Sequence, residues 1–192
     1  MNLQHVNAKL LVKNREGVDL ERLIPIFHSW IKDRVFDELL LDVADYRHVF
    51  EGPGVAVIGH EANYSVDDED GRLGVRYNRK AVLDGSNQDR FTQATRAALN
   101  ALQRLEADSR MDGKLQFGGH EIDIFINDRL LAPNTGATRE STKDDFALFA
   151  KTLFQSAEYS LSHAADPRRL FGCTLKASRP FTVSELLKNL ES

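Results

Sequence analysis

Residues 55–80, VAVIGHEANYSVDDEDGRLGVRYNRK, contain the pattern that decides the fold. Asp70-Gly71 is a strong two-residue turn signal, and it separates two runs in which apolar and polar residues alternate. If these two residues form the loop, Val66 faces Val75 across the pair, and Tyr64 faces Tyr77. Apolar side chains then meet on one face, which predicts an antiparallel hairpin.

Outward from this hairpin, hydrophobic periodicity predicts alternating strands and helices. Ser141 with Asp144 and Thr182 with Glu185 have capping-box spacing, so a helix is expected after each. The expected strands cover residues 8–13, 38–46, 55–67, 72–80, 114–127, 159–163 and 170–177, and two further helices cover 20–35 and 88–107. The order β-α-β-β-β-α-β-α-β-β-α predicts an α+β fold, a mixed, mainly antiparallel sheet with helices packed on it.

The chain is long enough to form one hydrophobic core. With 192 residues, of which 42% are hydrophobic, a single α+β domain over 1–192 is expected. The segment 83–88, LDGSNQ, is the best internal boundary, and it would divide the chain into subdomains 1–83 and 88–192.

Composition excludes several classes of function. The net charge is −4 and no basic stripe is present, which argues against nucleic-acid binding. No apolar run is long enough to cross a membrane, and the first residues lack the pattern of a signal peptide. Cys173 is the single cysteine, so no intramolecular disulfide can form. We therefore expect a cytoplasmic protein.

The tripeptide Gly-His-Glu occurs twice, at residues 59–61 and 119–121, and each copy opens a strand-like run. Duplicated halves are one interpretation, although three identical residues do not establish them. In a regular strand His60 and Glu61 point to opposite faces and cannot converge on one ligand. Because successive side chains of a strand point to opposite faces, His60 and His120 are expected on the apolar faces of their strands.

Two interpretations stay open for the first copy. The hairpin register pairs Glu61 with Lys80, so Glu61 is explained by a cross-strand ion pair. His60 is explained by a core position satisfied through one hydrogen bond. The alternative is that His60 belongs to a site built with side chains of a neighbouring strand.

The segment 38–48 offers those side chains. Asp42, Asp45 and His48 lie in an otherwise apolar context, and Asp45 is expected at the end of its strand. We expect Asp45, His48 and His60 to form a polar cluster below Gly52-Pro53-Gly54. A divalent metal, held by His48 and His60, is the alternative for this cluster; no cofactor is predicted.

One resemblance is carried by FHSWI at residues 27–31, DELLLDVADY at 37–46, GPG at 52–54 and GHEA at 59–62. This pattern resembles a group of small bacterial proteins of uncharacterised function, and it covers about the first 80 residues. The resemblance implies a bacterial cytosolic protein and brings no activity, substrate or catalytic residue with it.

Two classes of function follow. The first is a non-catalytic module that binds a ligand or a partner, and it is preferred because no set of acid, base and nucleophile can be assembled from the spacing. The second is a metal-binding protein or metal-dependent enzyme that uses Asp45, His48 and His60. Homo-oligomerisation through a sheet edge or an uncovered sheet face is also expected.

Overall fold

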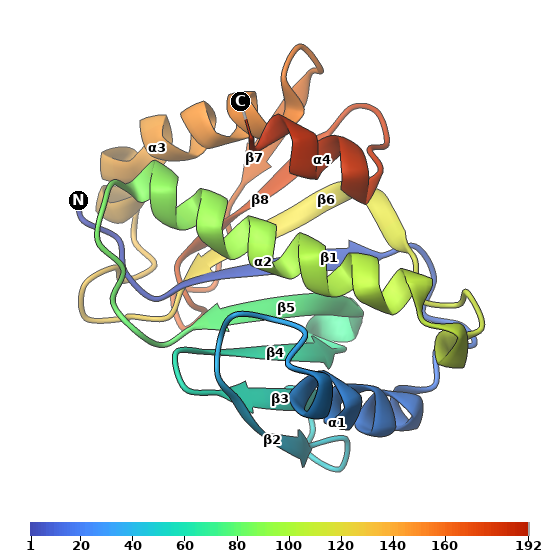
Figure 1. Cartoon of the computed structure of the whole chain (residues 1–192). Helices are drawn as coiled ribbons and strands as arrows, with labels where there is room; N and C mark the ends of the chain where they lie inside the picture. Colours follow the sequence, from blue (N-terminus) through green and yellow to red (C-terminus); the bar gives the residue numbers. More distant parts are fainter. Residues whose placement is uncertain (192) are drawn as a thin grey trace.

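The computed structural model describes residues 1–191, and its centre is one antiparallel sheet of eight strands (Figure 1). The strand order is β2-β3-β4-β5-β1-β6-β8-β7, and each pairing in it is antiparallel. The strands are β1 (Val6–Val12), β2 (Leu40–Asp45), β3 (Val55–Gly59), β4 (Ala62–Asp67), β5 (Gly74–Arg79), β6 (Phe117–Ile126), β7 (Tyr159–Ser162) and β8 (Gly172–Ala177). The predicted α+β class is confirmed.

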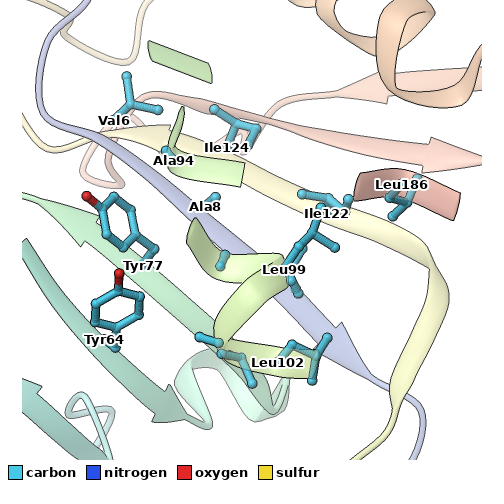
Figure 2. Packing of buried hydrophobic residues seen from close by; sticks show 14 of the residues in the cluster. Val6, Ala8, Tyr64, Tyr77, Ala94, Leu99, Leu102, Ile122, Ile124 and Leu186 are labelled. Atoms are coloured by element: carbon cyan, nitrogen blue, oxygen red, sulfur yellow. The ribbon is translucent and has the colours of Figure 1, made fainter. Parts of the chain in front are cut away.

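The four α-helices join the apolar core that covers one face of this sheet. They are α1 (Leu23–Asp33), α2 (Asn87–Ala107), α3 (Gly136–Phe154) and α4 (Val183–Asn189). In Figure 2, Leu99 and Leu102 of α2 lie over Ala8 of β1 and Ile122 of β6. Burial of these side chains, at roughly 1.5–3 kcal/mol each for the larger ones, is the main force that holds the layers together.

The hairpin register predicted from Asp70-Gly71 is confirmed. Tyr64 lies opposite Tyr77, and Val66 lies opposite Val75. All four side chains are buried on the helix-covered face. The predicted second hairpin is also present, as β7 pairs with β8.

The predicted single strand over 55–67 is wrong, because the chain turns at His60-Glu61 and forms β3 and β4. Gly59 makes this tight turn possible: a Cβ atom there would lie 2.4 Å from the backbone oxygen of Ala62. The observed order is therefore β-α-β-β-β-β-α-β-α-β-β-α, with one strand more than the sequence predicted.

The start of α3 also differs from the prediction. The hydroxyl of Thr135 accepts a hydrogen bond from the backbone N–H of Thr138, and the helix begins at Gly136 rather than after Ser141. The capping box of Thr182 and Glu185 forms as predicted at the start of α4.

Strand β1 connects the two halves of the chain. It pairs with β5 on one side and with β6 on the other, so the sheet continues from the N-terminal half into the C-terminal half. This position also places polar side chains of β1 in the middle of the face that is opposite the helices.

Candidate functional site

The candidate site residues in β2 and in the segment just after it lie on the surface. Asp42, Asp45 and His48 are all exposed, and Asp45 forms an ion pair with Arg47 at 2.7 Å. The hydrogen bonds from Arg47 lower the pKa of Asp45 to about 2. Asp45 is thus a satisfied surface carboxylate at the end of β2.

His60 does not reach these residues. It is exposed in the turn between β3 and β4, and its backbone N–H donates to the carbonyl oxygen of Leu39. Asp45 pairs with Val55 at the opposite end of β2, about 17 Å away at the rise of a strand. The expected cluster of Asp45, His48 and His60 is not formed. Within residues 1–191, no group of three or more His, Cys, Asp or Glu side chains is placed to hold a metal ion.

Glu61 is also exposed, and its ion-pair partner is Arg79, at 3.1 Å, instead of Lys80. The amino group of Lys80 donates to the carbonyl oxygen of Gly59 at 2.5 Å. The second Gly-His-Glu copy lies inside β6, where His120 is half-buried and near the carbonyl oxygen of Ala177. The two copies thus occupy different structural positions, one in a turn and one in a strand.

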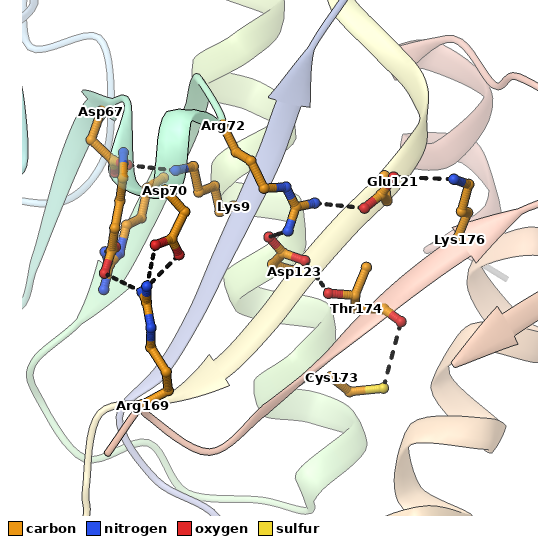
Figure 3. Close-up of polar contacts among 12 residues, drawn as sticks. Lys9, Asp67, Asp70, Arg72, Glu121, Asp123, Arg169, Cys173, Thr174 and Lys176 are labelled. Carbon is orange, nitrogen blue, oxygen red and sulfur yellow. Dashed lines mark hydrogen bonds and ion pairs between the residues drawn. The ribbon is translucent and has the colours of Figure 1, made fainter. Parts of the chain in front are cut away.

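The face of the sheet opposite the helices carries a row of polar side chains. Neighbours in the register are Ser65, Arg76, Lys9, Asp123 and Thr174, which come from β4, β5, β1, β6 and β8 in turn. Figure 3 shows Lys9, Asp123 and Thr174 of this row on adjacent strands. We call this surface the polar face.

A cavity of about 640 Å³ lies on the polar face. Its floor is formed by strand residues, among them Lys9, Arg76, Asp123, Phe125 and Thr174. Its walls are the β4–β5 turn with Glu69, Asp70 and Arg72, the segment after β6 with Asn127 and Arg129, and the β7–β8 loop with residues 164, 166 and 168–170. This volume suits a small ligand.

The floor is fixed by a buried ion pair. Lys9 Nζ lies 2.5 Å from Asp67 Oδ1, and the two side chains are 4% and 0% exposed. The stem of Lys9 passes over Gly74, where a Cβ atom would lie 2.8 Å from Lys9 Cε. Gly74 therefore gives Lys9 the room to cross β5 and reach Asp67 in β4.

A second polar network links the β4–β5 turn to β6 and β8. Arg72 donates to Glu121 at 2.5 Å and lies 3.2 Å from Asp123, which accepts from the Thr174 hydroxyl at 2.5 Å. Burial raises the pKa of Asp123. Asp123 is thereby held in place by one cation and one hydroxyl.

The β7–β8 loop is connected across the cavity to the β4–β5 turn. Arg169 binds both carboxylate oxygens of Asp70, 99 residues away in the chain (Figure 3). In the same loop Arg168 pairs with Asp166 at 2.9 Å. The guanidinium of Arg168 is outside the floor, as its side chain is 90% exposed.

A second hollow, of about 700 Å³, lies between segment 15–20 and segment 46–54. Loop residues rather than strand residues form most of its lining, Phe50 among them, which is 91% exposed. Side chains held on strands are positioned more accurately than side chains on loops. We therefore take the cavity on the polar face as the candidate site.

Cys173 borders the cavity but is expected to be unreactive. Burial raises the pKa of its thiol to about 12, so at pH 8 only on the order of one molecule in ten thousand carries the nucleophilic thiolate. Ellman's reagent should modify native protein much more slowly than protein in denaturant, with a rate that rises throughout the range from pH 8 to pH 10. Fast modification of the native protein at pH 8 would contradict this assignment.

Sequence reasoning missed the residues of this cavity, although part of the signal was present. Polar residues at alternate positions, such as Asn7 and Lys9 or Glu121 and Asp123, mark a polar face on each strand. The order of the strands, which brings these positions into one row, is not encoded in any single segment.

No helix within residues 1–191 is long and apolar enough to cross a membrane. Comparison with known proteins gives no match to a family model, to a curated protein or to a solved structure. The assignment of the candidate site therefore rests on the geometry of the structure alone.

Proposed function

We propose that this protein is a non-catalytic binding module that holds a small, polar, charged ligand in the cavity on the polar face. The observation that carries the proposal is the floor of this cavity, where Lys9, Arg76 and Asp123 project from three adjacent strands. A concave site with a few convergent polar groups is the usual form of a small-molecule site.

The state of the charged groups favours binding over catalysis. Glu69, Asp70, Asp123 and Asp166 are each engaged by an arginine, and the thiol of Cys173 is buried. Groups held in ion pairs are suited to position a ligand and less suited to transfer a proton. The metal-dependent alternative is not proposed, because Asp45 and His48 lie far from His60.

Blocking the cavity tests this function. Ala164 is an exposed wall residue, so Ala164→Trp should fill the mouth without disturbing the core. The matched control is Ala165→Trp, which changes an exposed neighbour outside the lining. Thermal unfolding is measured with a panel of carboxylates, phosphates, amino acids, polyamines and sugars.

A ligand at 100 times its Kd should stabilise the native protein and Ala165→Trp by about 2.7 kcal/mol. The same ligand should have little effect on Ala164→Trp. Equal stabilisation of both variants would place the binding elsewhere, and a panel without any stabilising compound would count against the proposed function.

Two further expectations stay proposals. The edges of the sheet are β2 and β7, and exposed Leu39, Leu41 and Phe50 lie in or near β2, where homo-oligomerisation would be expected. Sedimentation velocity measures the oligomeric state directly. A cytoplasmic location is supported by the single cysteine, which is free and buried.

A further inference from the structure

Arg76 has a special position in the cavity. Its guanidinium carbon lies 4.5 Å from the centre of the Phe125 ring, and its Nη1 atom donates to Glu69 at 3.0 Å. A cation–π contact and a charged hydrogen bond together fix the orientation of the guanidinium plane. Arg76 is therefore preorganised before any ligand arrives.

One edge of this guanidinium is left without a protein acceptor. The Nε atom is buried, and it has no hydrogen-bond partner in the part of the chain that the structure describes. A buried donor of a charged group that lacks an acceptor destabilises the protein. An acceptor supplied by a ligand would recover this free energy.

Four of the five acidic groups of the lining are held by cations. Asp70 uses both oxygens for Arg169, and Asp123 contacts both Arg72 and Thr174. Asp166 binds Arg168, and Glu69 binds Arg76. The fifth, Glu51, is exposed to solvent, so the buried donor edge of Arg76 has no counterpart among these carboxylates.

Lys9 lies next to Arg76. It is the register neighbour of Arg76 in β1, and its buried ammonium is held by Asp67. The two cations lie side by side on the floor and both line the cavity. A planar oxyanion can use the Nε edge of Arg76 in a bidentate arrangement.

We propose that Arg76, supported by Lys9 and oriented by Phe125, binds an oxyanion group of the ligand, either a carboxylate or a phosphate. This inference rests on the proposed function and specifies the class of ligand. The unpartnered Nε edge of Arg76, and not the net charge, determines this preference.

The test uses succinate and inorganic phosphate as oxyanion probes, with spermidine and glucose as cationic and neutral probes. The Nε–H signal of Arg76 is followed by NMR in the native protein, and affinity is measured by calorimetry. Arg76→Lys retains the charge and removes the Nε edge. Arg179→Lys is the matched control, because Arg179 also stacks on a phenylalanine and pairs with a glutamate but lies outside the cavity lining.

We expect at least one oxyanion to shift the Arg76 Nε–H signal, and Arg76→Lys to weaken its binding about tenfold or more. Arg179→Lys should bind it like the native protein. A preference for succinate or for phosphate identifies which oxyanion is bound. The NMR measurement does not require a variant, so it stays decisive if Arg76→Lys folds poorly.

Two results would overturn the inference and are distinguishable. Binding of spermidine or glucose at cavity residues, without any oxyanion effect, would reject the oxyanion and leave the binding module standing. If none of the probes changes any cavity signal, the oxyanion site is rejected, and the proposed function then depends on the wider panel with Ala164→Trp.

Discussion

Replacing Asp67 with alanine should lower the free energy of unfolding by about 3–5 kcal/mol, because it leaves the ammonium of Lys9 buried without its counter-charge. Lys9 is 4% exposed and Asp67 is 0% exposed, so water cannot replace the lost partner. Lys9→Met should have a cost of similar size for the reverse reason. Urea denaturation, analysed with a common m-value, measures both effects.

The double variant Lys9→Met with Asp67→Leu separates the pair from its surroundings. It should cost much less than the sum of Lys9→Met and Asp67→Leu measured singly, since apolar residues of similar volume often replace a buried ion pair without loss. The control is Arg15→Ala, which breaks the ion pair with Asp68 from an arginine that is 71% exposed, and should cost about 1 kcal/mol or less. Additive effects of Lys9→Met and Asp67→Leu would show that the two groups do not stabilise each other.

Glu38→Ala should give the second large loss of stability, about 3 kcal/mol, through the hydrogen bonds that its carboxylate accepts. The hydroxyl of Tyr64 donates to it at 2.7 Å and that of Tyr77 at 2.6 Å. These tyrosines are 2% and 0% exposed, so both hydroxyls would lose a buried partner. Phe36 stacks on Tyr64 next to Glu38, so the variant should also loosen the segment between α1 and β2.

Two further variants serve as controls for Glu38→Ala: one removes a hydrogen-bond partner of Glu38, and the other retains an acceptor at position 38. Tyr64→Phe should cost less, about 1–1.5 kcal/mol, because it removes one hydrogen bond and leaves the carboxylate with Tyr77. Glu38→Gln retains an acceptor and should fall between Tyr64→Phe and Glu38→Ala. An effect of Glu38→Ala below that of Tyr64→Phe, measured by thermal and urea unfolding, would contradict the network.

The same network gives a pH dependence. Burial raises the pKa of Tyr77 to about 12, and burial together with the Glu38 carboxylate also raises the pKa of Tyr64. A tyrosine with a raised pKa in the folded state stabilises the fold fully below pH 10, and this contribution is lost as pH rises toward 12. Alkaline unfolding should therefore begin above pH 10, and Tyr64→Phe should reduce its steepness.

Local sequence patterns predicted the hairpin because turn chemistry and alternation agree there. The apolar residues can meet on one face in one register only, with Tyr64 opposite Tyr77. The predicted two-residue loop is wrong, since residues 68–73 connect the strands and Glu69–Gly71 form a 3-10 turn there. The helix at Asn87–Ala107 was equally clear, because its buried residues recur at helical spacing.

The turn at His60-Glu61 was missed for a physical reason. The apolar run VAVI at residues 55–58 and the alternation that begins at Ala62 are both typical of strands, so periodicity alone does not show the reversal. The signal was Gly59, since a glycine inside a strand pattern often marks a close approach of the backbone. Once the chain turns there, His60 points to solvent rather than into the core.

The candidate site could not be predicted from any one segment. Lys9 and Arg76 become neighbours because β1 lies between β5 and β6, and Arg169 meets Asp70 across 99 residues. Sequence patterns identified polar strand faces, but the order of the strands decides which of these faces share a cavity. His48 and Asp45 attracted attention by residue type, and they proved to be satisfied or exposed surface groups.

Chemical-shift mapping during titration with succinate and with phosphate tests the central claim, an oxyanion-binding site on the polar face, most directly, because it reports where a ligand binds. The account predicts that the backbone signals of Lys9, Phe125 and Thr174 shift together and saturate at one ligand concentration. Shifts confined to residues 39–61, around Asp45, His48 and His60, or no saturable shift on the polar face with either probe, would contradict it.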